Sequence, residues 1–305
     1  MKVFVTGVNG QLGHDVVNEL YARGHTVIGS DLKPVYSGIA DGTFVTHAPY
    51  VSLEITQEDA VLKTVNQVRP DAVIHCAAWT AVDAAEEPEN RKTVFAVNED
   101  GTRNIARASR AVNAKMAYIS TDYVFDGTGT EPWQADSTEF APQNVYGASK
   151  LAGEKAVRET LESYFIVRTA WVFGLNGKNF VRTMVSLGKT HRQLRVVNDQ
   201  IGTPTYTPDL ARLLVDMVQT DRFGTYHATN EGGFISWADF ATEIFRQTGQ
   251  GVAVLPVTTA EYGLSTAKRP FNSRLSKEKL SKAGFERLPT WQDALARYLK
   301  DAAFL

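Results

Sequence analysis

Short apolar runs alternate with amphipathic stretches through the first half of the chain. Mostly apolar runs occupy residues 3–6, 26–30, 72–76, 116–120 and 165–169. Runs of this length and character are typical of strands buried on both faces of a parallel sheet. The pattern therefore predicts five parallel strands in this part of the chain.

Helical patterns separate these strands. The first begins at residue 12, and others cover residues 60–68, 91–112 and 146–161. Thr56 and Asp59 are expected to cap the helix at 60–68. Strands that alternate with helices of this length predict an α/β fold with a doubly wound, Rossmann-type parallel sheet. Residues 32–50 have little periodicity and are expected to form a surface excursion.

After residue 171 the pattern loosens. Helices are predicted at residues 180–187, 208–219, 236–247 and 290–300, with short strands at 194–197, 225–228 and 252–257. We expect a smaller C-terminal substrate-binding lobe that closes over the carboxyl edge of the sheet, where doubly wound folds bind ligands. The predicted division separates a dinucleotide-binding domain, residues 1–172, from residues 173–305, which form mainly this lobe, with segments that could return to the first domain.

Composition narrows the class of protein. The 305 residues are 43% hydrophobic and 22% charged, which is ordinary for a globular enzyme, and the formal net charge of −2 predicts no nucleic-acid or membrane partner. No apolar run approaches the roughly 20 residues that a membrane span needs. The one cysteine, Cys76, excludes an intrachain disulfide and fits a cytoplasmic location. The histidines show no ligand spacing, so no metal site is predicted.

Three glycines follow the first strand at three-residue spacing, at Gly7, Gly10 and Gly13. In a dinucleotide-binding turn the first glycine makes the turn, the second lets a pyrophosphate approach, and the third lets helix and strand pack closely. The alternative is an ordinary strand-to-helix connection. Asp31, at the end of the next strand, favours the dinucleotide because its carboxylate can accept the ribose hydroxyls of NAD. Lys33 argues for the 2′-phosphorylated cofactor, so NADPH and NADH both stay open.

Tyr146 and Lys150 lie four residues apart at the start of a predicted helix, so they share one helical face. A lysine ammonium near the phenol favours the phenolate and helps the tyrosine to exchange a proton near neutral pH. Such a pair is common, and a solvated pair is the alternative. Thr121, at the carboxyl end of a strand, can hydrogen-bond a substrate carbonyl and complete a catalytic set, or else cap a loop.

Several motifs resemble those of the extended short-chain dehydrogenases/reductases, and in particular the dTDP-4-dehydrorhamnose reductase family. The resemblance covers nearly the whole chain. The motifs are TGVNGQLG at 6–13, HCAAWTAVD at 75–83, STDYVFDG at 120–127, YGASKLAGE at 146–154, RTAWVFG at 168–174, DQIGTPT at 199–205 and KRPFNS at 268–273. Glu54 stands where the family more often has Asp, and residues 33–50 are longer than usual.

The resemblance implies three sets of site residues. The catalytic set is Thr121, Tyr146 and Lys150. The cofactor set is Gly7, Gly10, Gln11, Leu12, Gly13, Asp31, Glu54, Ile55, Ala77, Ala78, Trp79, Asn98, Tyr146 and Lys150. The substrate set is Val82, Thr121, Asp122, Tyr123, Tyr146, Trp171, Asp199, Gln200 and Arg269. In the cofactor set, residues 10–12 would contact the pyrophosphate, Asp31 the ribose, and Glu54 with Ile55 the adenine.

Four members of the substrate set have structural alternatives. Trp171 could be a core aromatic, and Arg269, expected near the diphosphate as a bidentate donor, could cap a loop. Asp199 and Gln200 could be turn residues.

The resemblance implies an oxidoreductase that uses NADPH or NADH to reduce the C4 keto group of dTDP-4-dehydro-L-rhamnose, which gives dTDP-L-rhamnose. The expected partner is thus a dTDP-linked 4-keto-6-deoxysugar, and a homodimer is compatible with the family. One alternative is a non-catalytic subunit similar to the regulatory β subunit of methionine adenosyltransferase. Another is a related nucleotide-sugar epimerase or ketoreductase.

Overall fold

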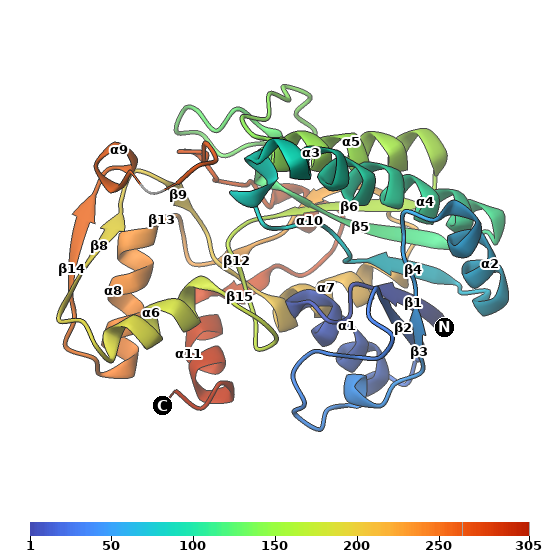
Figure 1. The fold of residues 1–305 in the computed structure, drawn as a ribbon, viewed down its shortest axis with the longest axis horizontal. Coiled ribbons are helices and arrows are strands. Elements are labelled where there is room, and N and C mark those ends of the chain that lie inside the picture. Colours follow the sequence, from blue (N-terminus) through green and yellow to red (C-terminus); the bar gives the residue numbers. More distant parts are fainter. Residues whose placement is uncertain (264, 305) are drawn as a thin grey trace.

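The computed structural model describes residues 1–263 and 265–304, and a seven-stranded parallel sheet forms the larger of its two lobes (Figure 1). The strand order is β11-β6-β5-β4-β1-β2-β3, and all neighbours are parallel. The strands are β1 (Lys2–Thr6), β2 (Thr26–Asp31), β3 (Tyr50–Ser52), β4 (Ala72–His75), β5 (Lys115–Thr121), β6 (Tyr164–Thr169) and β11 (Gly224–His227). The chain order reverses between β1 and β4, the place where such sheets bind ligands. The predicted doubly wound α/β fold is confirmed.

Helices cover both faces of this sheet. One face carries α2 (Glu58–Val68), α4 (Thr102–Ala111) and α5 (Val145–Thr160), and the other carries α1 (Gln11–Ala22) and α7 (Thr207–Val218). Alternate residues of β1 enter the two cores: Val3 and Val5 pack in the α1 and α7 core, whereas Phe4 packs in the other. This alternation explains why the strand is apolar at every position.

The second lobe is built on a pair of parallel strands, β8 (Gln193–Val197) and β14 (Ala253–Val257). Three helices pack with it: α6 (Phe180–Gly188), α8 (Trp237–Thr248) and α11 (Trp291–Asp301). Its core is rich in aromatic rings, and Phe173 lies 5.8 Å from Phe240 and 5.4 Å from Tyr298 between ring centroids. This lobe therefore has a hydrophobic core of its own.

Short strands and short helices connect the two lobes or lie at their edges. Paired short strands are β7 (Val172–Phe173) with β10 (Thr205–Tyr206), β9 (Ile201–Gly202) with β13 (Ile235–Ser236), and β12 (Asn230–Glu231) with β15 (Leu288–Thr290). Short helices are α3 (Pro88–Phe95), α9 (Thr259–Tyr262) and α10 (Glu278–Lys282). Within residues 1–263 and 265–304, no helix combines the length and apolar character needed to cross a membrane.

The predicted strands and helices of the first half are confirmed within a few residues, with three differences. The helix predicted at residues 91–112 is interrupted: α3 and α4 are joined by a π-helical turn, Ala96–Gly101. β3 was not predicted as a strand, because its three residues, which pair with β2, are too few to form a clear pattern in the sequence. The capping prediction for α2 is wrong, since Thr56 donates to Glu54 (3.0 Å) and Gln57 occupies the N-cap position.

Two elements of the second half belong to the first lobe. The strand predicted at residues 225–228 is β11, which pairs with β6 at the edge of the main sheet. The helix predicted at 208–219 is α7, which packs against α1. Burial of Leu210 and Leu214 against Val16 and Leu20 accounts for this placement. The chain therefore returns to the first lobe before it completes the second.

A buried ion pair joins α5 to the sheet. Glu154 accepts hydrogen bonds from Arg168 of β6 through both carboxylate oxygens (2.7 and 2.8 Å), and Ser120 of β5 donates to it at 2.6 Å. Both charged side chains are almost completely shielded from solvent. Burial alone would raise the pKa of Glu154, but Arg168 and Arg158 outweigh it and the pKa is lowered. Glu154 is therefore a buried anion that holds β5, β6 and α5 together.

Replacing Arg168 by Met should lower the free energy of unfolding by about 3–5 kcal/mol, because it leaves a buried carboxylate without its main partner. Urea unfolding measures the change. The double variant Glu154→Gln with Arg168→Met should recover part of the loss, because the uncompensated charge is gone. Equal stability of the single and double variants would show that the charge of Glu154 does not matter.

Candidate active site

The glycine-rich turn between β1 and α1 is shaped by close backbone packing. Gly7 has φ +76°, and a Cβ there would lie 2.5 Å from the backbone nitrogen of Ala77. A Cβ on Gly13 would lie 2.2 Å from the carbonyl oxygen of Gly7, whereas one on Gly10 would come no closer than 3.2 Å to that oxygen. Gly7 and Gly13 are therefore required by the turn itself, and Gly10 leaves space at its surface.

This turn forms one end of a cavity of about 660 Å³ at the carboxyl edge of the sheet. Nearly all of the predicted cofactor residues line it, together with the predicted catalytic residues. They are Gly7, Gly10, Gln11, Leu12, Gly13, Asp31, Glu54, Ile55, Ala77, Ala78, Trp79, Thr121, Tyr146 and Lys150. We call this space the cofactor cavity, and its wall also includes Val82, Asp122, Tyr123 and Trp171 from the substrate set.

Asp31 lies at the end of β2 and is oriented by the glycine-rich turn. Its Oδ2 accepts the backbone N–H of Asn9 (3.0 Å) and its Oδ1 accepts that of Leu32 (2.8 Å). Each carboxylate oxygen can accept a further hydrogen bond. The arrangement therefore fits the expected role of Asp31 toward a ribose.

Asn98 is buried and does not appear in the wall of the cofactor cavity as the structure describes it. Its side chain instead accepts from the N–H of Trp79 (2.8 Å) and donates to the carbonyl of Trp79 (3.1 Å) and to Ser149 (2.9 Å). Asn98 lies in the π-helical turn, a feature that often marks functional positions. It therefore positions a wall residue of the cavity and the start of α5.

The first two turns of α5 present Tyr146 and Lys150 to the cavity. Asn144 caps this helix and accepts the N–H of Gly147 at 2.7 Å. The ammonium of Lys150 lies 4.2 Å from the ring centroid of Tyr118. Thr121, at the end of β5, lines the same cavity, and its hydroxyl donates to Asp122 at 3.0 Å. The three predicted catalytic residues are therefore close together.

Burial controls the charge of this group. It raises the pKa of Tyr146 well above the usual value near 10, although Thr121 opposes the shift. It lowers the pKa of Lys150 to about 7, although the charge of Glu154 opposes the shift. The expected lowering of the pKa of the phenol by Lys150 is not found, because burial dominates, and Tyr146 is a neutral hydroxyl, the form that a proton donor needs.

Asp122 lies beside this group and is fully buried. It accepts hydrogen bonds from Thr121 (3.0 Å) and from Ser273 of the second lobe. Burial raises its pKa to about 6, although both hydrogen bonds oppose the shift. Asp122 therefore links the end of β5 to the second lobe, and it titrates near neutral pH.

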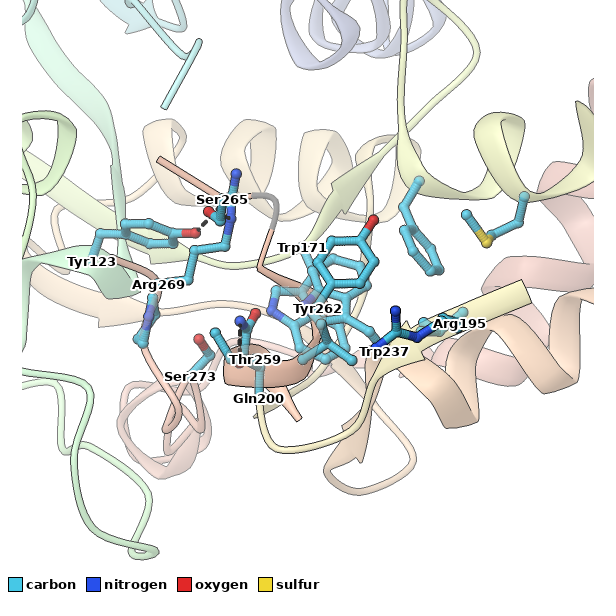
Figure 2. A pocket seen from close by; sticks show the side chains of 15 residues that line it. Tyr123, Trp171, Arg195, Gln200, Trp237, Thr259, Tyr262, Ser265, Arg269 and Ser273 are labelled. Atoms are coloured by element: carbon cyan, nitrogen blue, oxygen red, sulfur yellow. Dashed lines mark hydrogen bonds between the residues drawn. The ribbon is translucent and has the colours of Figure 1, made fainter. Parts of the chain in front are cut away.

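A second cavity, of about 300 Å³, adjoins the first and is lined mainly by the second lobe (Figure 2). Tyr123 and Trp171 line both cavities. Trp171 stacks on Trp237 with ring centroids 3.7 Å apart and an interplanar angle of 14°. We call this space the aromatic cavity, and its wall includes two further residues of the substrate set, Gln200 and Arg269.

Arg269 is held at the end of the aromatic cavity that Tyr123 and Ser265 also line, as Figure 2 shows. Its guanidinium donates to Asp83 (2.6 Å), Tyr123 (3.2 Å) and Ser265 (2.9 Å). Asp83 also accepts the backbone N–H of Ala267 at 3.0 Å. Arg269 therefore both lines the cavity and fastens the 265–269 segment to the first lobe.

Asp199, which was predicted to contact substrate, binds the first residue of α9. Its carboxylate accepts the N–H (2.9 Å) and the hydroxyl (2.6 Å) of Thr259. It is outside the described walls of both cavities. The neighbouring Gln200 reaches the same hydroxyl at 3.0 Å while it lines the aromatic cavity. Asp199 therefore joins the end of β8 to α9, and its contact with a substrate stays a prediction.

Sequence analysis missed several cavity residues. Ser273 stands within a recognised motif and Lys178 lies four residues after another, so their neighbourhoods were available as signals. Asp83, which also stands within a motif, binds Arg269 and is outside the described walls of both cavities. Trp237, Arg195 and Tyr262 lie outside the motifs, and only the fold brings them to the aromatic cavity. In the described part of the chain, no three His, Cys, Asp or Glu side chains are grouped so that they could hold a metal ion.

The chain was compared with known protein families. A family model described as the RmlD substrate binding domain matches residues 1–304. The chain belongs to this family. The match runs through both lobes, so RmlD family membership covers the cofactor cavity and the aromatic cavity together.

Relatives of this RmlD family chain are similar over nearly their whole length. It is 39% identical to the spore coat polysaccharide biosynthesis protein SpsK of Bacillus subtilis over 98% of this chain and 97% of that one. It is 40% identical to a dTDP-4-dehydrorhamnose reductase of Streptomyces griseus, over 95% of this chain and 90% of that one. The solved structure of a dTDP-4-dehydrorhamnose reductase from Bacillus anthracis, in complex with NADP, is 41% identical to this chain with a TM-score of 0.88. The match covers 98% of this chain and 99% of that one.

A pair of alanine variants tests the glycine-rich turn. Gly13→Ala should lower the free energy of unfolding by several kcal/mol, roughly the cost of overpacking, because its Cβ meets a backbone oxygen that cannot move freely. Gly10→Ala should fold nearly normally but bind the predicted dinucleotide at least about tenfold more weakly, since its Cβ faces the space left for phosphate. Urea unfolding and ligand titration measure both. A Gly10→Ala variant with unchanged dinucleotide affinity would contradict this assignment.

The pKa of Asp122 gives a pH-dependent stability. Because the folded-state pKa is about 6 and the unfolded value is near 4, folding is favoured by protonation, and stability falls as pH rises from 4 to 6. Over this interval wild type should lose up to roughly 3 kcal/mol relative to Asp122→Asn, which cannot ionise. Urea unfolding at several pH values measures the difference. A difference that does not change with pH would exclude Asp122 as the titrating group.

Proposed function

We propose that the protein uses NADPH or NADH to reduce the C4 keto group of dTDP-4-dehydro-L-rhamnose, with dTDP-L-rhamnose as the product. The observation that carries this proposal is that Thr121, Tyr146 and Lys150 share one cavity with the glycine-rich turn. The names of full-length relatives support it, since the Streptomyces griseus and Bacillus anthracis proteins are dTDP-4-dehydrorhamnose reductases.

The cofactor cavity fits a dinucleotide along its length. Gly10 leaves the turn surface open at the start of α1, where the pyrophosphate would lie. Asp31 would hold the adenosine ribose, and Glu54 with Ile55 would lie at the adenine. Lys150 would hold the second ribose at the catalytic end. The Bacillus anthracis relative is in complex with NADP, whereas Asp31 favours NAD, so the proposal includes both cofactors.

When it is bound, the nicotinamide supplies a hydride to the C4 carbon of the sugar. Tyr146 supplies the proton, because its buried, neutral hydroxyl can donate to the oxygen as that oxygen gains negative charge. Thr121 orients the carbonyl oxygen toward this hydroxyl. The ammonium of Lys150 stabilises the tyrosinate left after proton transfer, and solvent then restores the proton. The protein thus contributes positioning, a proton and a positive charge.

The aromatic cavity fits the nucleotide part of the substrate. The stacked rings of Trp171 and Trp237 offer a flat surface to a base, and Arg269 offers charged donors to a diphosphate. Because Tyr123 and Trp171 line both cavities, a single molecule could place its sugar beside Tyr146 and its nucleotide in the aromatic cavity. Val82 and Asp122 would then lie along the sugar.

We further infer a cytoplasmic location, since the single cysteine fits a reducing compartment, and no nucleic-acid partner, since the net charge is −2. A homodimer stays a prediction that light scattering can test.

Tyr146→Phe should lower kcat by about 10²–10⁴, the range expected for loss of a general acid. It should bind NADPH nearly as wild type does, because only the hydroxyl is removed. Stopped-flow absorbance of the reduced nicotinamide with dTDP-4-dehydro-L-rhamnose measures kcat, and fluorescence titration measures binding. Reduction at the full rate by the variant would contradict the assignment of Tyr146 as the proton donor.

The wild-type assay, run separately with NADH and NADPH, also separates the alternatives. A reductase consumes the reduced cofactor in proportion to the sugar, whereas an epimerase regenerates its cofactor in each cycle and gives no steady absorbance loss. A non-catalytic subunit would bind cofactor without turnover. Steady oxidation of either cofactor is the expected result.

A further inference from the structure

The walls of the cofactor cavity carry few positive charges for a ligand with an anionic centre. Among the cavity residues that the structure describes, the basic side chains are Lys150 and Lys178, and the acidic ones are Asp31, Glu54 and Asp122. Lys150 lies with Tyr146 at the catalytic end and has a pKa near 7. A pyrophosphate at the glycine-rich turn would therefore depend on Lys178 for a neutralising cation.

Lys178 comes from a segment that is fastened to the glycine-rich turn. This segment, residues 174–179, connects β7 to α6 in the second lobe. The side chain of Gln11 accepts the backbone N–H of Gly174 (2.8 Å) and the amide of Asn179 (3.2 Å). Three hydrogen-bonding groups thus meet where α1 begins.

A second set of bonds completes this attachment. Asn176, which is buried, donates to the carbonyl oxygens of Asn9 (3.0 Å) and Gly10 (3.1 Å). Its own oxygen accepts the N–H of Ile39 at 2.9 Å. The backbone on both sides of Lys178 is therefore held against the turn by Asn176 and Asn179, whereas the lysine itself is exposed and lines the cavity.

We infer that Lys178 binds the pyrophosphate of the dinucleotide cofactor, and that residues 174–179 are a clasp that brings this second-lobe cation to the glycine-rich turn. The inference rests on the proposed function for the identity of the cofactor. An ammonium on a flexible stem suits a phosphate because it acts as a point charge at the edge of the site. It also gives the second lobe a direct contact with a ligand held mainly by the first.

Titration of ligand binding to the whole protein tests this inference. Lys178→Met should weaken the binding of NADPH, NADH and ADP-ribose by about tenfold each, since all three contain the pyrophosphate. Adenosine, which lacks phosphate, should bind wild type and variant equally. The ratio of variant to wild-type dissociation constants should shrink at high salt. Lys178→Arg should restore most of the affinity, and Lys189→Met, which removes another exposed lysine near this lobe's surface, should bind as wild type does.

Different failures lead to different conclusions. Equal affinity of wild type and Lys178→Met for all three pyrophosphate ligands would overturn the inference and leave the proposed reductase intact. A loss confined to NADPH would overturn it as well, because Lys178 would then contact the 2′-phosphate. An equal loss of affinity for adenosine would overturn the inference too, because it would show that the variant disturbs the turn itself and not a contact with phosphate. Wild type that binds neither NADPH nor NADH would overturn the proposed function and the inference together.

Discussion

A single buried carboxylate, that of Glu154, fastens α5 to the sheet and opposes the effect of burial on the charge of Lys150. Ser120 and Arg168 bind it from two adjacent strands, and it follows Lys150 by one helical turn of α5. Burial lowers the pKa of Lys150, and the charge of Glu154 opposes that shift. Without this anion the lysine would more readily become neutral, and α5 would lose its main polar attachment to the sheet.

The site depends on two adjoining cavities with a common wall. The wall contains Trp171, whose φ of +51° is unusual for a residue with a large side chain. Such a conformation persists only where the surroundings fix it, and here the ring is stacked on Trp237. The strain lies where the cofactor cavity and the aromatic cavity meet, so one residue shapes the walls of both.

The fold could be predicted from sequence because buried parallel strands leave continuous apolar runs, as at residues 72–76. The cofactor cavity could be found because its residues follow those strands in short motifs. The aromatic cavity could not, since Arg195, Trp237 and Tyr262 are brought together only by packing of the second lobe. Asp199 shows the limit of a motif: it lies in one, yet its carboxylate binds Thr259 of α9 and lies outside the described walls of both cavities. The functional roles of the remaining residues stay predictions.

The return of α7 and β11 to the first lobe limits how the chain can be divided into separable parts. β11 covers the β6 edge of the main sheet, and α7 covers the apolar side of α1. A polypeptide that stopped at residue 172 would leave both uncovered, so residues 1–172 are not a module that can be cut out or joined to a new partner. The aromatic cavity is therefore more easily reshaped by replacing its wall residues, such as Arg195, Gln200 and Arg269, than by exchanging a whole lobe.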